Sequence, residues 1–430
     1  MSQASYMLSS IPGPDDITRV ELANGIVVLA RPNFNSPSIT ISGSLAVGSL
    51  FDPEEKLGLA DFTASALMRS TQSKDFQQIY DLIETAGARM MFSGGTHTSG
   101  FGGKSLVEDL DLLLGLIADV LQNPVFPEIQ VERLRANIMT GLDLRAQDTG
   151  DRAAMAFDEL VYAGHPYAKC EEGYPETIRK ITRADLEAFH KKHYGPAGMH
   201  IAVVGGINPQ EAVEKVEAAL GSWRNPQQPP VPALPELQPL AARVDIRVPM
   251  PAKSQSDIVI GVAGPERAHP QYLAAAVGNN ILGEFGMMGR IGESVRERSG
   301  LAYYAYSSMG GGLGPGPWAV FAGVDPKDEE KAVDLILAEV SRFAAELVTE
   351  EELADTKANF IGRMPLGLES NGGVAGVLLN IEKHALGLDY YRRFPDLVRE
   401  VSREDIRRAA ETFLHTDAFA VAVAGPPRDE

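Results

Sequence analysis

The first half of the chain shows a strand pattern followed by a helix pattern. Residues 26–29 and 38–45 carry β-branched residues and alternating apolar positions, which predicts half-buried strands. Residues 57–70, 76–85 and 106–121 space their apolar positions three and four residues apart, which predicts amphipathic helices. The first half is therefore predicted to form a mixed α+β unit.

The second half repeats this succession of elements. Its patterns predict strands at residues 257–262 and 301–308 and helices at residues 272–282 and 329–347. Between the halves, residues 225–239 contain six prolines, which exclude a persistent helix or a central strand. We expect this segment to be a linker between two domains.

Two segments of the first half recur in the second half. Residues 181–205 align without a gap with residues 401–425, at an offset of 220. Residues 127–138 align with residues 349–360, at an offset of 222. Because both pairs occur in the same order along the chain, we infer that one domain has been duplicated.

The longer repeat begins with a helix N-cap in each half. Thr182 and Ser402 are followed three residues later by Asp185 and Asp405, a shortened form of the capping box. The fold class expected is α+β, with two homologous domains that each form a mixed, mostly antiparallel sheet with helices packed on it. The predicted domains are residues 1–224 and 240–430.

Composition and charge exclude several classes of function. Of the 430 residues, 44% are hydrophobic, and 39 basic against 58 acidic residues give a formal net charge of −19. Such a chain repels phosphate backbones and anionic lipids, so we expect neither nucleic acid nor a membrane as a partner. The single cysteine, Cys170, excludes an intrachain disulfide and a cysteine-based zinc cluster.

The N-terminal residues lack the pattern of an intact secretory signal. The first basic residue is Arg19, and residues 1–16 contain no unbroken apolar core. No apolar run approaches the roughly 18 residues that span a bilayer. We expect a cytoplasmic protein, or a periplasmic one if a leader has been removed.

Two glycine-rich stretches resemble functional loops. Residues 94–105 (GGTHTSGFGGKS) are similar to a phosphate-binding loop, but Thr98 stands where the motif requires its first glycine. We interpret this stretch as two strand ends around a turn. Residues 310–317 (GGGLGPGP) are interpreted as the tip of a hairpin.

Three histidines offer an alternative metal site. His190 and His193 lie three residues apart near a predicted helix end, and His200 on the following strand is a candidate third ligand. An enzyme built on this site would hold zinc tightly in the isolated chain. The interpretation that we favour is that His190 and His193 are exposed near a helix C-terminus, where positive charge is stabilising.

Residues 58–71 (GLADFTASALMRST) resemble the signature helix of the pitrilysin-type zinc peptidases, the family of insulin-degrading enzyme and mitochondrial processing peptidase. Members that cut peptides carry H-x-x-E-H there, with two histidines that bind zinc and a glutamate that activates water. Here the five positions read Asp61, Phe62, Thr63, Ala64 and Ser65. Ala64 cannot act as a base, and Ser65 cannot replace an imidazole ligand.

The family's third zinc ligand is also replaced. It is a glutamate in a helix similar to residues 131–148, at a position that corresponds to Thr140 or Gly141. The resemblance therefore implies a chain that holds no catalytic zinc of its own.

A second feature of the family is retained. Residues 282–308 resemble the segment in which an arginine and a tyrosine, seven residues apart, bind the peptide backbone across a closed chamber. The corresponding residues are Arg296 and Tyr303. The alternative is that Arg296 forms a surface ion pair with Glu293 or Glu297 and that Tyr303 is a core residue.

The local sequence supports the functional alternative. Gly300 at the C′ position would end a helix, so that Arg296 lies on its last turn and Tyr303 on the next strand, and both can face one cavity. The short loop expected at residues 283–289 has fewer glycines than its counterpart in the non-catalytic processing-peptidase subunit. We therefore expect no loop that grips substrate there.

The resemblance implies a division of labour between two chains. In two-subunit members, the chain that keeps the arginine and the tyrosine lacks the zinc motif and completes the active site of its partner. We expect a non-catalytic, substrate-binding subunit, one half of a clam-shaped heterodimer, that has no activity alone. The homologous partner would supply zinc, and the substrate would be a peptide. The alternatives are an inert scaffold subunit, as in respiratory complexes, and a homodimer that binds peptides without cutting them.

Overall fold

The computed structural model describes residues 11–427, and of these every side chain except that of Met287. The chain divides into two compact units, and each unit combines segments from both halves of the sequence. The first unit consists of Met1–Thr140, Cys170–Ala233 and Met364–Arg393, and the second of Gly141–Lys169, Leu234–Arg363 and Phe394–Glu430.

The first unit is built on a six-stranded sheet with the strand order β1-β2-β6-β3-β5-β4. Strands β2 and β6 are parallel, and all the other pairs are antiparallel. The strands are β1 (Thr18–Glu21), β2 (Val27–Pro32), β3 (Ser38–Leu45), β4 (Arg89–Ser93), β5 (Ser99–Leu106) and β6 (His200–Gly205).

The second unit repeats this sheet without the first strand. Its order is β7-β11-β8-β10-β9, and β7 and β11 form its parallel pair. When β1 is set aside, the two sheets have the same order and the same strand directions. The prediction of a duplicated α+β domain is therefore confirmed. The strands are β7 (Val244–Pro249), β8 (Ser256–Ala263), β9 (Ala302–Met309), β10 (Pro317–Val324) and β11 (Ala420–Gly425).

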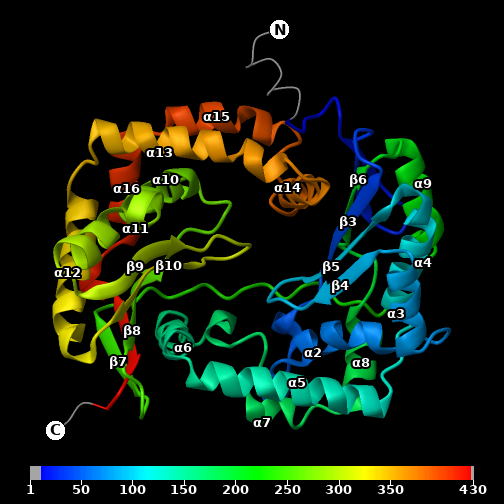
Figure 1. The fold of residues 1–430 in the computed structure, drawn as a ribbon, viewed down its shortest axis with the longest axis horizontal. Coiled ribbons are helices and arrows are strands. Elements are labelled where there is room, and N and C mark those ends of the chain that lie inside the picture. Colours follow the sequence, from blue (N-terminus) through cyan, green and yellow to red (C-terminus); the bar gives the residue numbers. More distant parts are fainter. Residues whose placement is uncertain (1–10, 428–430) are drawn as a thin grey trace. The chain divides into compact units, whose positions relative to one another are not determined.

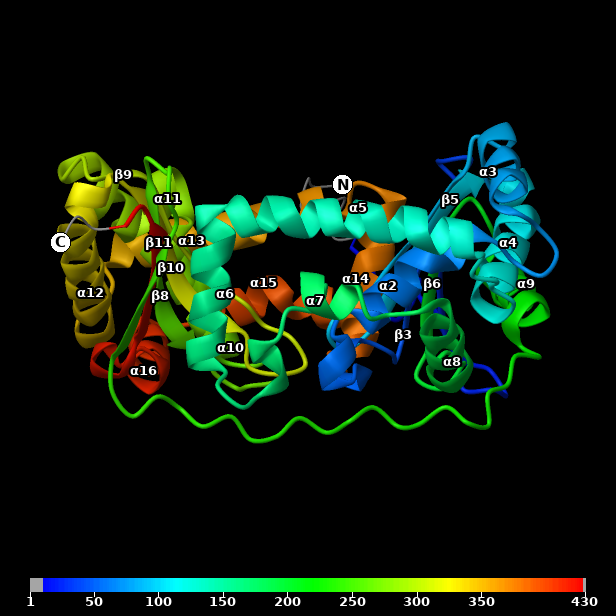
Figure 2. The ribbon, with the colours of Figure 1, turned by 90° about the horizontal axis from the view of Figure 1, so that it is seen from below.

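Helices surround both sheets (Figure 1). The first unit contains α2 (Leu59–Ala66), α3 (Phe76–Thr85), α4 (Leu110–Gln122), α7 (Pro175–Ile178), α8 (Arg183–His193), α9 (Pro209–Leu220) and α14 (Asn371–Lys383). The second contains α6 (Thr149–Val161), α10 (Tyr272–Gly283), α11 (Phe285–Ile291), α12 (Glu329–Ala345), α13 (Glu350–Arg363) and α16 (Arg403–Phe413). The division between the units falls within α5 (Glu128–Gln147), a single uninterrupted helix, and within α15 (Tyr390–Glu400) (Figure 2).

The two halves of the sequence exchange one helix. Helix α6 comes from the first half of the chain but packs on β8 and β11 of the second unit, through Phe157 and its neighbours. Helix α14 comes from the second half but packs on β3 and β6 of the first unit, through Val374 and Leu378. The helices α6 and α14 follow the same repeat at an offset of 222, so the exchange is reciprocal.

Both faces of the second sheet are apolar because both are covered. Ile258 and Ile260 of β8 pack with α10, α12 and α16, whereas Val259 between them packs with α6. Since successive strand residues point to opposite faces, a strand covered on both sides reads as a continuous apolar run. This is the pattern of β8 and β11 in the sequence.

The predicted helix starts are confirmed in detail. Thr182 and Ser402 cap α8 and α16, and each accepts a hydrogen bond from the backbone N–H of the aspartate three residues later. The Asp185 and Asp405 side chains accept in return from the backbone N–H of the capping residues. The predicted strands and helices occur within a few residues of their predicted bounds.

The predicted linker, residues 225–239, connects the two halves of the chain, but the compact units do not divide at this segment alone. These residues form neither helix nor strand, as their prolines require. The compact units nevertheless differ from residues 1–224 and 240–430, because residues 141–169 and 364–393 lie in the opposite unit. Within residues 11–427, no helix is both long enough and apolar enough to cross a bilayer.

Candidate functional site

The residues at the degenerate zinc motif share one short helix of the first unit. Asp61, Ala64 and Ser65, the positions that the resemblance assigns to the motif, lie on α2. Asp61 and Ser65 are four residues apart and therefore on one helix face, with Ala64 beside them. Ala64 is buried, whereas Asp61 and Ser65 are half-buried.

The start of α2 is fixed by a glycine and an aspartate. Gly58 has a φ of +91°, and a Cβ there would lie 2.7 Å from the Glu172 carbonyl oxygen, so the position requires glycine. The Asp52 carboxylate accepts hydrogen bonds from the backbone N–H groups of Gly58 and Ala60, both at 2.8 Å. These bonds satisfy donors that the first turn of a helix leaves unpaired.

Buried carboxylates dominate the electrostatics around α2. Burial, together with the nearby Glu172 and Glu171, raises the pKa of Asp61 to about 6, against the lowering effect of the Gly94 N–H. Burial also raises the pKa of Asp52 to about 7, although backbone N–H groups oppose the shift. This end of α2 is therefore acidic and partly protonated near neutral pH.

The position of the third family ligand lies on α5. Thr140 is exposed, and its hydroxyl donates a hydrogen bond to the Ala136 carbonyl oxygen at 2.9 Å. Helix α5 reaches α2 at Arg135, whose guanidinium lies 5.3 Å from the centre of the Phe62 ring. Thr140 is thus engaged with its own helix.

These side chains do not suit a catalytic zinc ion. A site of this kind needs three nitrogen, sulfur or carboxylate ligands, and only Asp61 among the motif positions has one. Ala64 has no functional group, and the hydroxyls of Ser65 and Thr140 are poor ligands for zinc. Among residues 11–427, no group of three or more His, Cys, Asp or Glu side chains could hold a metal ion.

The prediction that His190 and His193 are exposed is wrong. His190 and His193 lie at the end of α8 as predicted, but they are not exposed: His193 is buried against Phe51 and Phe189. His190 packs on Tyr194. Burial lowers the pKa of both histidines to about 4, so they are neutral at physiological pH.

The three histidines also have separate environments. The Nε2 atom of His190 lies 2.8 Å from the Leu121 carbonyl oxygen. His200 lies on β6, where burial lowers its pKa and where Glu382 and Arg19 also affect its titration. The aromatic spacing of α8 could have indicated this packing, because Phe189 and Tyr194 flank the two histidines.

We expect Asp61→Asn to stabilise the protein at high pH only. The pKa of Asp61 is raised in the folded state, so its protonation favours folding below about pH 4, and this benefit is lost as the pH rises through about 6. An asparagine keeps an acceptor for the Gly94 N–H without the charge. Thermal unfolding should show about 1–2 kcal/mol of added stability at pH 8 and little change at pH 4. Asp81→Asn, at an exposed position of α3, is the control and should show no such difference.

Arg296 lies on an irregular helix of the second unit. Residues Gly292–Arg298 form a π-helix, a rare element that is frequently found at functional sites. It ends as predicted, because Gly300 has a φ of +63° and its N–H donates to the Arg296 carbonyl oxygen at 3.0 Å. The wide turns of a π-helix shift Arg296 from the direction that an α-helix would give it.

Tyr303 lies on a β-bulge at the start of β9. Ala302 pairs with Val324 and Tyr304 pairs with Gly323, so Tyr303 is the extra residue between two consecutive partners. A bulge re-aims a side chain and is over-represented beside active sites. The Tyr303 side chain is 84% exposed, the highest value among the large hydrophobic residues described.

The alternative interpretation is that Arg296 forms a surface ion pair and that Tyr303 is a core residue. The structure agrees with it in part for Arg296 and not for Tyr303. Arg296 Nη1 lies 3.8 Å from Glu297 Oε1, an ion pair that is too long for a hydrogen bond. Tyr303 is on the surface and not in the core. The π-helix and β9 pack against each other, so Arg296 and Tyr303 belong to neighbouring elements.

The segment expected as a loop at residues 283–289 is mostly helical. Helix α10 runs to Gly283, and α11 begins at Phe285. Gly289 has a φ of +61°, and a Cβ there would lie 2.5 Å from the Ile281 carbonyl oxygen. The glycine therefore permits a tight approach between the two helices.

Comparison with known proteins agrees with this architecture. A family model described as insulinase (peptidase family M16) matches residues 27–163, and one described as peptidase M16 inactive domain matches residues 180–360. Together they span well over half of the chain. The chain belongs to peptidase family M16. This M16 protein departs from the peptidases of the family at the H-x-x-E-H positions, which is consistent with a non-catalytic homologue.

Relatives and solved structures match this M16 chain over 62% to 100% of its length. An uncharacterized zinc protease of Streptomyces coelicolor is 23% identical over 100% of this chain and 94% of its own length. Cytochrome b-c1 complex subunit 1 of Homo sapiens is 27% identical over 62% of this chain and 56% of its own. The crystal structure of a peptidase M16 inactive domain from Pseudomonas fluorescens is 26% identical, with a TM-score of 0.88, and covers 96% of this chain and 99% of its own.

Proposed function

We propose that this M16 protein is the non-catalytic, substrate-binding subunit of a heterodimeric zinc metallopeptidase. The observation that carries the proposal is the pair of irregularities on either side of Gly300. A π-helix holds Arg296 and a β-bulge holds Tyr303, and within residues 11–427 neither side chain forms a hydrogen bond that would give it a structural role. Both kinds of irregularity interrupt regular backbone hydrogen bonding, and both are found frequently at functional sites, where they re-aim side chains.

Each residue has a defined role in peptide binding. The Arg296 guanidinium offers several donors to a peptide carbonyl or carboxylate oxygen. The Tyr303 hydroxyl can donate to the oxyanion that develops on the attacked carbonyl. The homologous partner would supply the metal-activated water and the general base, which Asp61, Ala64 and Ser65 cannot provide.

An inert scaffold or peptide-binding homologue is the second candidate. It is favoured by the similarity to cytochrome b-c1 complex subunit 1, a component of a larger assembly by its name. A pure scaffold would not need Tyr303 at the surface, because no substrate would contact its hydroxyl. A homodimer that binds peptides without cutting them would need both Arg296 and Tyr303.

Purification from the native source tests the proposal directly. We expect a homologous chain with an intact H-x-x-E-H motif to co-purify in equal amount, and the pair to hydrolyse peptides. The isolated chain should be inactive and should contain no stoichiometric zinc by elemental analysis. Stoichiometric zinc in the isolated chain, or a mixed pair without peptidase activity, would contradict the proposal.

A further inference from the structure

Strand β7 of the second unit has a neighbour on one side only. It pairs in parallel with β11, as β2 pairs with β6 in the first unit. The other edge of β2 is covered by β1, which pairs with it antiparallel. Among residues 11–427, no strand covers the corresponding edge of β7.

The linker explains why this edge is open. The segment that precedes β7 occupies the place in the chain that β1 occupies before β2. It contains Pro235 and Pro239, which have no N–H to donate to a ladder. Strand β7 is therefore an uncovered edge, which in other proteins is a template for pairing with a further strand.

The direction of the backbone groups on this edge follows from the ladder with β11. The Val244 N–H donates to the Phe419 carbonyl oxygen at 2.9 Å, and the Met250 N–H to that of Gly425 at 2.7 Å. The backbone N–H and C=O groups of the even-numbered residues of β7 thus point toward β11. The N–H and C=O groups of Asp245 and Arg247 point to the open side, since these groups alternate along a strand.

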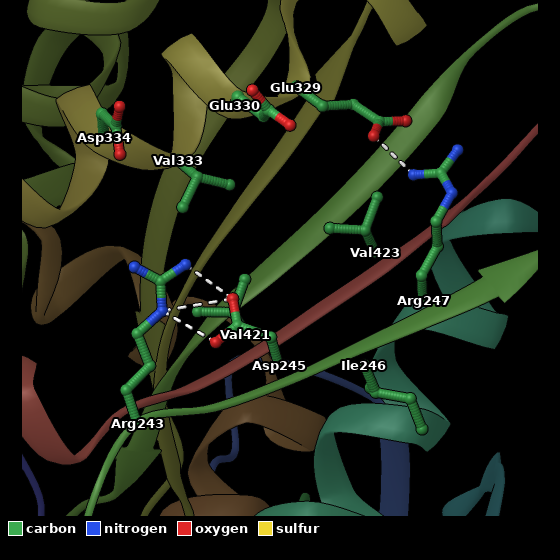
Figure 3. A pocket seen from close by; sticks show the side chains of 10 residues that line it. All are labelled: Arg243, Asp245, Ile246, Arg247, Glu329, Glu330, Val333, Asp334, Val421 and Val423. Carbon is green, nitrogen blue, oxygen red and sulfur yellow. Dashed lines mark hydrogen bonds and ion pairs between the residues drawn. The ribbon is translucent and has the colours of Figure 1, made fainter. Parts of the chain in front are cut away.

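The side chains along this edge are charged with opposite signs (Figure 3). Arg243 donates through Nε and Nη2 to the Asp245 carboxylate. Arg247 donates to Glu329 and to the Pro426 carbonyl oxygen, while its Nε has no hydrogen-bond partner among the described residues. The edge is accessible, and Val244 is 37% exposed.

We propose that β7 pairs antiparallel with β7 of a second copy of this chain, about a two-fold axis at Ile246. In this register Asp245 lies opposite Arg247 of the second copy, and Arg247 lies opposite its Asp245. Both are pairs whose N–H and C=O groups point outward, so each pair exchanges two backbone hydrogen bonds. Val244 lies opposite Val248, and the two five-stranded sheets become continuous.

Charge selects this register over its neighbours. A shift to the two-fold register centred on Asp245 places two aspartates opposite each other, and the register centred on Arg247 places two arginines opposite each other. Like charges directly opposite in a ladder are destabilising, whereas opposite charges stabilise. The register centred on Ile246 also ends at Pro249, which limits the ladder to a short segment. The surface is self-complementary, as a two-fold dimer requires.

A single cysteine tests both the partner and the register. Ile246 is the one position whose side chain would lie opposite its own copy, in a pair with Cα atoms about 4.5 Å apart, within the range of about 4.4–6.8 Å that a disulfide spans. In a Cys170→Ser background, Ile246→Cys should form a covalent dimer under mild oxidation. The matched control Val244→Cys should not, because it faces Val248 of the second copy. Absence of the Ile246→Cys dimer, or equal cross-linking of both variants, would overturn the proposal.

The unmodified protein provides an independent test. Sedimentation should show a monomer–dimer equilibrium that Asp245→Lys shifts at least tenfold toward monomer, since the introduced lysine would face an arginine. Asp396→Lys, the same charge change at an exposed position of α15, should leave it unchanged. Hydrogen exchange at the Asp245 and Arg247 amides should slow as concentration rises. A monomer at all concentrations, with both amides exchanging freely, would contradict the dimer whether or not the cysteine variants fold.

Discussion

Tyr303→Phe is expected to lower the turnover of the reconstituted peptidase pair by about 10- to 100-fold, with little change in KM. The substitution removes one hydroxyl from an 84% exposed side chain and leaves its ring in place. If that hydroxyl stabilises the developing oxyanion, its loss affects the transition state more than the bound substrate. The measurement is steady-state hydrolysis of a peptide by the mixed pair at saturating and limiting substrate.

Neighbouring residues provide matched controls. Tyr306 lies three residues further along β9 and is partly exposed, and its ring stacks on Phe321 at 5.3 Å. Tyr306→Phe should leave turnover unchanged. If it lowers turnover as much as Tyr303→Phe does, the effect is structural. If the Tyr303→Phe variant has unchanged kinetics, the Tyr303 hydroxyl takes no part in catalysis and the residue is simply exposed at the surface.

The architecture could be predicted because its signals are local. The capping boxes at Thr182 and Ser402 depend on residues three positions apart, and the strand and helix periods depend on a few turns of chain. The sequence repeat at an offset of 220 then predicted the same sheet in both halves, because similar sequence patterns fold into similar sheets. Strands β6 and β11 are equivalent, because each lies between the first two strands of its repeat: β6 between β2 and β3, and β11 between β7 and β8.

Other features have no local signal. The exchange of α6 and α14 depends on which of the two sheets each helix packs on, and the apolar face of an amphipathic helix does not specify its partner. The bulge at Tyr303 arises because β9 holds one residue more than β10 opposite it, which is a property of two strands together. The burial of His193 depends on Phe51, which is far away in the sequence.

Phe157→Ala should therefore destabilise the second unit, although the residue belongs to the first half of the chain. The Phe157 side chain is 2% exposed and packs with Val259 of β8 and with the alanines of β11. Removing a buried phenylalanine leaves a cavity between helix and sheet, and the free energy of unfolding should fall by about 3–5 kcal/mol. Urea unfolding measures this change, and Glu159→Ala, at an exposed position of the same helix, should alter it little.

Hydrogen exchange identifies the unit that loses its support. In the Phe157→Ala variant, the amides of β8 and β11 should lose protection first, while those of β3 and β6 keep theirs. Leu378→Ala on α14 should give the opposite result, because Leu378 is buried in the cluster with Leu29 and Val204 of the first unit. If each substitution instead weakened only the sheet of its own half of the sequence, the helix exchange would be wrong. If each substitution lowers the protection of the sheet in the opposite half, each half of the chain folds on a helix supplied by the other half. Cutting the linker at residues 225–239 would then leave the two halves bound to each other through α6 and α14.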